Sequence, residues 1–488
     1  MMHGMDGGGW LATVAQAATS ELAWLDLVYL LAAALFIFGL KMLSSVKTAR
    51  RGNLVSALGM LVAAGATLFY LTGGTAVSLI WVAVSLLIGT VVGLVIALRI
   101  PMTGMPQMVA LLNGFGGSAS LLVAAGDFAR HTASSTRAPY QLAAVGLAVL
   151  IGGATFTGSL VAFGKLQGLR ITPSRPVQFL GQKVVIVLLL MVALVLTVLL
   201  AVGGGSDAAT GVVVIAVASL LLGILLVIGI GGADMPVVIS LLNSYSGLAA
   251  SMAGFVLKNN ALIITGALVG ASGIILTNIM CKAMNRSLLN VLFGGVGGTG
   301  GGAGAAGSKA QGTARELTAE DVAIQLDAAG LVIVVPGYGM AVAQAQHAVK
   351  ELADNLEDRG IDVKYAIHPV AGRMPGHMNV LLAEAGVDYD QLCDLETINP
   401  EFEQASVALV IGANDVTNPA ARHAEDSPIY GMPILDVDKA RSVVVVKRSL
   451  NPGFAGVENE LYFKPNCGML FGDAKSVVNA LVGEMKDG

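Results

Sequence analysis

The sequence predicts a polytopic α-helical membrane domain of about nine transmembrane helices, followed by a soluble α/β domain built on a parallel sheet. The first observation is composition, since the 488-residue chain is 55% hydrophobic and only 12% charged, with a mean hydropathy of +0.76. Such a chain is too apolar for an ordinary soluble protein. The second is an abrupt change after residue 286, beyond which β-branched runs alternate with helical patterns, as in a doubly wound parallel sheet.

Apolar segments fill the first part of the chain. Each is long enough to cross a hydrocarbon core of about 30 Å at about 1.5 Å per residue. Some boundaries rest on turn signals alone, so eight or ten spans are also possible. We expect spans at 24–40, 54–72, 76–98, 104–126, 139–164, 179–202, 210–230, 235–257 and 260–281.

Charge and cysteine content narrow the possible locations and partners. With the N-terminus outside, most loop lysines and arginines fall on the inner side, which places the C-terminal domain in the cytoplasm. The net charge of −4 gives no basic footprint for nucleic acid. The three cysteines, Cys281, Cys393 and Cys467, show no metal or redox spacing and are expected to be reduced thiols.

The chain divides into four expected regions. A Gly/Ala/Ser run at 294–312 predicts a flexible tether. After it, Thr318 and Asp321 have the spacing of a capping box at a helix start. The expected regions are an N-terminal leader at 1–23, the transmembrane domain at 24–285, the Gly-rich linker at 286–316 and the α/β domain at 317–488.

The α/β domain is expected to alternate strands and helices. Apolar, β-branched runs predict the strands and 3.6-residue periodicity the helices. The expected strands are 331–335, 362–367, 407–411, 433–436 and 442–446, and the expected helices are 319–328, 341–358, 376–386, 389–396, 400–405 and 473–485.

A glycine turn follows the first of these strands and makes the domain Rossmann-like. Gly337-Tyr338-Gly339 joins the strand to a helix, and bare backbone N–H groups at such a turn suit a pyrophosphate. The third position is Val342, where the usual fingerprint has Gly or Ala. A tight turn that binds nothing would show the same glycines.

The nucleotide is predicted from the ends of two other strands. The second strand ends in His368-Pro369 with no carboxylate for a ribose 2′-hydroxyl, which favours a 2′-phosphate. Lys447, Arg448 and Ser449 follow strand 442–446 and offer phosphate ligands. The alternative is a charged pair that closes a strand at the surface.

Three further loops carry candidate residues. Asn414 and Asp415 follow strand 407–411, either beside a cofactor or in an Asx-turn. Arg373 either clamps an anion or lies at the surface of a capped helix. The loop 453–456 is either a lid or a connection.

These motifs, together with several in the membrane part, closely resemble the beta subunit family of the proton-translocating nicotinamide nucleotide transhydrogenase. The resemblance covers roughly residue 24 to the C-terminus. It rests on Gly337-Tyr-Gly-Met-Ala-Val-Ala-Gln344, Arg373-Met-Pro-Gly-His-Met-Asn-Val380, Gly412-Ala-Asn-Asp-Val416, Lys447-Arg-Ser449, Gly232-Ala-Asp-Met-Pro236, Asn243-Ser-Tyr-Ser-Gly247 and Met280-Cys-Lys-Ala-Met-Asn-Arg286.

The resemblance implies that the C-terminal domain binds NADP(H), while an alpha subunit holds NAD(H). Hydride would pass directly between the nicotinamides, and the membrane helices would couple this step to proton movement. It further implies a multi-pass protein of the bacterial inner membrane, assembled as a dimer of alpha–beta units. No metal is implied.

The resemblance also assigns roles to single residues. Asp415 and Asn414 would lie at the catalytic, nicotinamide end, with Asp415 as a redox-sensitive carboxylate. Phe454 stands where other members have Tyr, which removes a hydroxyl. The cofactor-binding set would be Gly337, Tyr338, Gly339, Met340, Ala341 and Val342 near the pyrophosphate, Lys447, Arg448 and Ser449 at the 2′-phosphate, the lid Gly453, Phe454, Ala455 and Gly456, and Arg373, Gly412, Asn414 and Asp415.

The membrane part departs from the family pattern. Many members carry a proton-binding histidine in the fourth span, where this chain has Asn113, and Asn does not titrate. The titrating group would then come from elsewhere, such as a histidine on a partner helix. Asn113, Ser159 and Asn243 would hydrogen-bond a water chain, or else join helices. Asp234, at the cytoplasmic end of a span, would contact the nucleotide domain or solvent.

A second hypothesis is a membrane transporter or channel with a cytoplasmic NADP-sensing domain. The chain has one dinucleotide fingerprint, so hydride transfer needs a partner that holds a second nucleotide, whereas a sensor needs none. A membrane-anchored dehydrogenase acting alone is disfavoured, because no acid/base pair accompanies the nicotinamide position.

Overall fold

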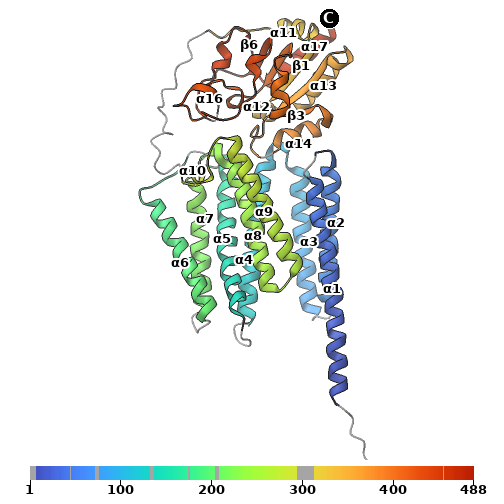
Figure 1. Ribbon diagram of the computed structural model, residues 1–488, viewed down its shortest axis with the longest axis vertical. Helices are drawn as coiled ribbons and strands as arrows, with labels where there is room; N and C mark the ends of the chain where they lie inside the picture. The colour runs from blue at the N-terminus through green and yellow to red at the C-terminus, as the bar shows by residue number, and fades with distance from the viewer. Residues whose placement is uncertain are drawn as a thin grey trace, which may run out of the picture.

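The computed structural model describes residues 7–43, 46–71, 76–131, 137–173, 176–203, 208–293, 313–374, 376–453 and 455–487. Within these ranges nine helices are long and apolar enough to cross a membrane, which confirms the predicted polytopic part. They stand side by side below the α/β domain (Figure 1). They are α1 Gly7–Leu43, α2 Val46–Leu71, α3 Ala76–Arg99, α4 Met105–His131, α5 Pro139–Gln167, α6 Gln182–Gly203, α7 Ala208–Ile228, α8 Met235–Leu257 and α9 Asn260–Ala283.

Two helices occupy stretches where none was expected. The backbone of α1 is helical from Gly7, although its apolar window begins only at Trp24. A short helix, α10 (Leu288–Phe293), lies within the expected linker. The Gly-rich run 294–312 itself falls outside the described residues.

Glycines allow the central membrane helices to pack backbone to backbone. A Cβ on Gly117 of α4 would lie 2.7 Å from the carbonyl oxygen of Gly152 on α5. A Cβ on Gly247 of α8 would lie 2.5 Å from the amide nitrogen of Gly270 on α9. In lipid there is no hydrophobic driving force between helices. Small residues at the contacts let the backbones approach closely, so that van der Waals packing holds the helices together.

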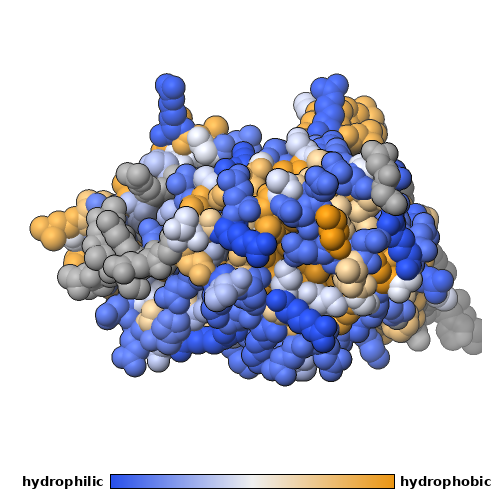
Figure 2. All heavy atoms as spheres, turned by 90° about the horizontal axis from the view of Figure 1, so that it is seen from above, coloured by the Kyte–Doolittle hydropathy of each residue, from blue (hydrophilic) through white to orange (hydrophobic). Residues whose placement is uncertain are grey.

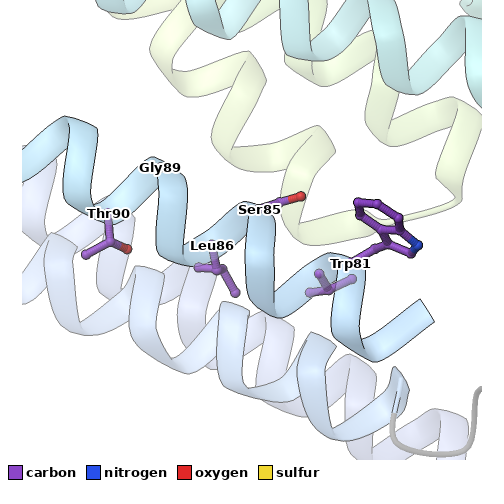
Figure 3. Close-up of a pocket in the computed structure, with 6 residues that line it drawn as sticks. Trp81, Ser85, Leu86, Gly89 and Thr90 are labelled. Carbon is purple, nitrogen blue, oxygen red and sulfur yellow. The ribbon is translucent and has the colours of Figure 1, made fainter. Parts of the chain in front are cut away.

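Helix α3 stands apart from this central group. A hollow of about 670 Å³ runs along one side of it, and Figure 3 shows Trp81 and Ser85 pointing away from the side that carries Leu86 and Thr90. None of the lining residues is ionisable, so the hollow offers no acid/base chemistry. They are Trp81, Val82, Ser85, Leu86, Gly89 and Thr90.

The α/β domain contains a six-stranded sheet in the order β3-β2-β1-β4-β5-β6, with every pair parallel. This confirms the predicted doubly wound parallel sheet. The order reverses between β1 and β4, which is the point where such sheets bind ligands. The strands are β1 Leu331–Pro336, β2 Asp362–Ile367, β3 Leu392–Asp394, β4 Val407–Ile411, β5 Ser442–Lys447 and β6 Cys467–Phe471.

The central strands β1 and β4 are apolar at every position, so both faces of the sheet must be covered, and a hydrophobic core lies on each. In β1, Val332 and Val334 pack into one core, and Ile333 and Val335 pack into the other. The first core is closed by α11 Ala319–Asp327, α12 Tyr338–Val342, α13 Gln346–Asp358, α14 His377–Glu384 and α17 Ala474–Asp487. The second is closed by α15 Leu395–Ile398 and the chain around Leu435, Val437 and Leu461.

Several expected elements are wrong in detail. The stretch 433–436 is not a strand, and β3 and β6 were not expected. The expected helix 389–396 is a 3₁₀ turn, then β3, then the start of α15, and 400–405 holds only the end of a 3₁₀ turn. The expected helix 341–358 is broken between α12 and α13, where Gln344 adopts a φ of 49°. The capping box is confirmed, since Thr318 and Asp321 bond reciprocally.

The α/β domain rests on the membrane helices through its ligand-binding edge. Figure 1 shows α14 on the side that faces the helices. Val370, in the loop after β2, packs against the buried cluster at the ends of α5, α8 and α9. Asn285, just after α9, donates its side-chain amide to the carbonyl of Tyr430 at 2.8 Å. The opposite face of the domain is mostly hydrophilic (Figure 2).

Candidate functional site

The candidate site lies where the loops after β1, β4 and β5 meet at the carboxyl edge of the sheet. Gly337 follows β1, Gly412 follows β4, and Arg448 follows β5. The parallel register brings these strand ends together, since Pro336 is paired with Ile411 and Ile411 with Val446. This is the edge at which doubly wound sheets bind ligands.

The glycine turn is locked against the end of β4. The N–H of Gly337 donates to the carbonyl of Ile411 at 2.9 Å, and the N–H of Gly339 donates to the carbonyl of Gly412 at 2.9 Å. Both N–H groups are therefore engaged within the protein in this structure. The helix that begins here, α12, spans only Tyr338–Val342, so it also lacks the length that a helix dipole requires.

These glycines are required by a close crossing of two loops. A Cβ on Gly337 would lie 2.3 Å from the Cα of Ala413, and one on Gly412 would lie 2.4 Å from the Cα of Gly339. Gly412 also adopts a φ of 67°, which favours glycine. The two loops therefore pack backbone to backbone across the ends of β1 and β4.

The 453–456 loop lies against Asn414 and Asp415. The N–H of Ala455 donates to Oδ2 of Asp415 at 3.0 Å. A Cβ on Gly453 would lie 2.6 Å from Nδ2 of Asn414, so only glycine allows this approach. Gly456 closes the turn by donating its N–H to Gly453 at 3.2 Å. Phe454 lies outside the described residues.

Asn414 keeps one polar group unused. Its Oδ1 accepts from the hydroxyl of Tyr462 at 2.7 Å, whereas Nδ2 is buried and has no hydrogen-bond partner in the described chain. A buried donor without a partner costs about 1–3 kcal/mol, and a ligand acceptor would relieve that cost. This donor fits a ligand that offers an acceptor oxygen, as a dinucleotide does.

The end of β5 supplies the positive charge of the site. Nζ of Lys447 lies 5.0 Å from the centroid of the Tyr462 ring and donates to the carbonyl of Asn451. Burial lowers the pKa of Lys447, and the Asp415 carboxylate opposes this effect. Arg448 is exposed and Ser449 half-buried. The structure thus brings Lys447 and Asp415 together, as expected for loops that share one sheet edge.

Arg373 points away from this group, towards the membrane helices. Its guanidinium carbon lies 4.5 Å from the centroid of the Tyr338 ring, and Nη1 donates to the carbonyl of Leu166 in α5 at 3.0 Å. Its backbone N–H donates to Nδ1 of His377 at 3.1 Å. Arg373 therefore connects the glycine turn, through Tyr338, to the end of a membrane helix.

Two residues of the site were missed from the sequence. Tyr462 contacts both Asn414 and Lys447, and Asn459 donates to the main-chain carbonyl of Asn414 at 3.0 Å. Both lie after β5 in Asn459-Glu-Leu-Tyr462, a stretch with no strand or helix periodicity. The one sequence signal was an Asn that could cap a turn, which Asn459 does by accepting from Leu461 at 3.0 Å.

The three polar residues expected along a water chain, Asn113, Ser159 and Asn243, lie on the adjoining helices α4, α5 and α8. Asn113 of α4 is buried and donates to the carbonyl of Ile239 on α8 at 3.3 Å. Ser159 of α5 is buried, and its Oγ has no hydrogen-bond partner among the described residues. A Cβ on Gly114 would lie 3.1 Å from that of Ser159. Asn243 is half-buried one helical turn after Ile239.

Asp234 is paired inside the membrane part. Its carboxylate accepts both bonds from Nη1 of Arg286, at 2.9 and 3.0 Å, at the end of α8 that faces the α/β domain. Its side chain is 13% exposed. The expected contact with the nucleotide domain or with solvent is thus replaced by a partly buried ion pair that links α8 to the chain after α9.

The chain matches a family described as NAD(P) transhydrogenase beta subunit over residues 25–484. It is similar to a protein named NAD(P) transhydrogenase subunit beta from Rhodospirillum rubrum, with 50% identity over 462 residues, which cover 94% of this chain and 98% of the relative. A protein of the same name from a strain of that organism gives the same identity and coverage. No cluster of metal-ligating side chains occurs in the described ranges.

Proposed function

The chain belongs to the NAD(P) transhydrogenase beta subunit family, and from this we propose that it binds NADP(H) and translocates protons. In this proposal it couples hydride transfer between NAD(H) and NADP(H) to proton movement across the membrane. The observation that carries the proposal is the crossing of Gly337 and Gly412 at the switch point, with Lys447, Arg448 and the orphaned Asn414 amide around it.

The residues present divide the binding work between them. Lys447, Arg448 and Ser449 would hold the 2′-phosphate, because a cationic fork and a hydroxyl suit a phosphate. The crossing at Gly337 and Gly412 would support the pyrophosphate. When bound, NADP(H) supplies the nicotinamide that gives or takes the hydride.

Asn414 and Asp415 would orient the nicotinamide end. Asn414 has a donor for a carbonyl or hydroxyl of the ligand, and Asp415 is held by the N–H of Ala455. A carboxylate fixed in this way responds to the positive charge of an oxidised nicotinamide and not to the neutral reduced ring. The chain can therefore bind NADP⁺ and NADPH with different affinities.

Hydride transfer requires a second nucleotide from a partner. We propose that an NAD(H)-binding alpha subunit supplies it, because the α/β domain offers one dinucleotide-type crossing at the switch point of its sheet. The positive-inside bias would place this domain in the cytoplasm of a bacterium, beneath the inner membrane. A dimer of alpha–beta units is part of the same proposal.

Coupling would run through the contact between the domains. The site edge lies against the membrane helices, where Arg373 bonds Leu166 and Asn285 bonds Tyr430. A proton bound in the membrane part can drive hydride transfer only if it changes the affinity for NADP⁺ relative to NADPH, and the linkage is reciprocal. We propose that the segment 294–312 lets the domain leave this contact to meet its partner.

An NADP-sensing transporter would make the same contact between Arg373 and Leu166. The two functions are therefore distinguished by a hydride-transfer assay. The full-length chain in lipid nanodiscs is mixed with an NAD(H)-binding alpha subunit, NADH and an oxidised NADP analogue. Formation of the reduced analogue supports the transhydrogenase. Tight NADP binding without hydride transfer would favour the sensor, and absence of NADP binding would contradict both.

A further inference from the structure

Tyr462 lies beneath the candidate nucleotide site and bridges two of its strands. It belongs to the 3₁₀ turn Glu460–Phe463 and is only 2% exposed. Its hydroxyl donates to Oδ1 of Asn414 at 2.7 Å, after β4, and its ring lies 5.0 Å from Nζ of Lys447, at the end of β5. One side chain thus contacts both the amide and the ammonium group of the site.

The hydrogen bond from Tyr462 fixes which way the Asn414 amide faces. With Oδ1 bound to the hydroxyl, Nδ2 is directed to the position above Gly453, where a Cβ would be 2.6 Å from Nδ2 and 2.8 Å from Oδ1 of Asp415. This orientation leaves Nδ2 as a buried donor that has no hydrogen-bond partner among the described residues.

The hydroxyl remains a donor over the whole physiological range. Burial raises the pKa of Tyr462, so the phenol stays protonated. The ring face attracts the Lys447 ammonium, and this attraction increases as the cation is desolvated. Lys447 also donates to the carbonyl of Asn451, so its head group is held between the ring and the loop after β5.

We propose that Tyr462 is a positioning residue for NADP(H), through its hydroxyl at Asn414 and its ring at Lys447. The inference rests on the proposed function and adds a residue to it. The hydroxyl aims the Asn414 N–H group at an acceptor oxygen of the ligand. The ring holds the Lys447 charge where it meets the phosphate that distinguishes NADP(H) from NAD(H).

Two substitutions separate these roles. Tyr462→Phe removes the hydroxyl and keeps the ring, and Tyr462→Leu removes both. Dissociation constants for NADPH and NADH are measured by calorimetry on the full-length chain in nanodiscs. Tyr462→Phe should weaken NADPH and NADH binding alike, by about tenfold, because one oriented hydrogen bond is lost. Tyr462→Leu should in addition reduce the preference for NADPH by several-fold.

A double-mutant cycle tests whether the hydroxyl acts through Asn414. In an Asn414→Ala background, Tyr462→Phe should have no further effect on NADPH binding, because the group that it positions is gone. Tyr389→Phe, at an exposed tyrosine beside β3, is the matched control and should bind as the wild type does. Thermal unfolding of each variant shows whether it is folded.

The outcomes distinguish this inference from the proposed function. Wild type that binds NADPH, together with an unchanged Tyr462→Phe, would overturn the role of the hydroxyl. Additive losses in the cycle would show that the hydroxyl does not act through Asn414, which also overturns it. Wild type that fails to bind NADPH would instead overturn the proposed function.

Discussion

Nη1 of Arg373 lies 3.0 Å from the carbonyl oxygen of Leu166, and this bond crosses from the α/β domain to the end of α5. The same guanidinium lies 4.5 Å from the centre of the Tyr338 ring in the glycine turn. Gln107 of α4 also donates to Leu166, at 3.4 Å. The last turn of α5 is therefore the place where a shift of the membrane helices would reach the glycine turn directly.

A second contact across this boundary can be tested without altering the nucleotide site. Gly431 has a φ of 72°, and a Cβ there would lie 2.3 Å from Nδ2 of Asn285. Gly431→Ala should therefore break the bond from Asn285 to Tyr430 and expose both segments, as measured by faster hydrogen exchange at 283–287 and 421–432. Gly386→Ala is the control, since Gly386 has a φ of 81° and nothing within 4 Å.

Both substitutions carry a similar backbone strain of about 1 kcal/mol. Only Gly431→Ala adds the clash with Asn285. Equal exchange in the two variants would mean that the contact does not hold the domain to the membrane part.

The phosphate-binding role of Lys447 and Arg448 predicts a change in selectivity. Replacing both by Ala should weaken NADPH binding by about 100-fold or more, since hydrogen bonds to charged groups contribute about 1.5–3 kcal/mol each and about 1.4 kcal/mol is a factor of ten. NADH binding should change little, because NADH lacks the 2′-phosphate. Competitive binding of the two nucleotides to the full-length chain measures the ratio. Arg441→Ala, at an exposed site before β5, should preserve it.

The sequence predicts the inner strands and the site edge but not the ends of the sheet. β1, β4 and β5 are runs of mostly apolar, β-branched residues, and nearly all of their positions are buried. Burial on both faces requires such a continuous apolar run, which is easily recognised in the sequence. β6 contains Cys467, Gly468 and Met469, which favour no strand by themselves, and it forms because β5 pairs with it. β3 is only three residues long.

The same limit applies to the site. Asn414 and Lys447 were predictable because each follows a strand, and parallel strands end at one edge. Tyr462 lies in a 3₁₀ turn well beyond the end of β5, and only tertiary packing brings it beneath the strand ends. The direction of Arg373 depends on a carbonyl in α5, about 200 positions earlier in the chain, and no local pattern records that contact.

His368 predicts an acid-sensitive step in the stability of the α/β domain. It is 2% exposed, its Nε2 lies 2.7 Å from the carbonyl of Pro433, and its Nδ1 accepts the N–H of Val370 at 3.2 Å. Only the neutral ring with its proton on Nε2 satisfies both bonds. Burial lowers the pKa of His368 from 6.5 to about 4.

The sign of the pH effect follows from proton uptake. The unfolded chain binds this proton below about pH 6.5 and the folded chain only near pH 4, so the stabilisation is complete above pH 6.5 and is lost as the pH falls towards 4. His368→Gln should lower the free energy of unfolding at pH 7. Between pH 4 and 6.5 it should also reduce the slope of that free energy against pH by the contribution of one proton, about 1.4 kcal/mol per pH unit. Unfolding midpoints over this range, with His423→Gln at a largely exposed histidine as control, measure the slope. An unchanged slope would contradict the assignment.

Asn113 allows the proton-pathway proposal to be separated from helix packing. Hydrogen bonds between membrane helices contribute about 0.6 kcal/mol on average, so Asn113→Ala should change stability little. The side chain joins α4 to α8, and Ser159 on the adjoining α5 has a hydroxyl without a hydrogen-bond partner among the described residues. If both belong to a water chain, loss of Asn113 should slow hydride transfer driven by a pH gradient in proteoliposomes. NADPH affinity measured without a gradient should stay the same. Ser120→Ala is the matched control, because Ser120 is also buried on α4 but, among the described residues, bonds the carbonyl of Gly116 in its own helix, at 3.0 Å. Equal effects of the two substitutions on gradient-driven transfer would show that Asn113 serves only to join the helices.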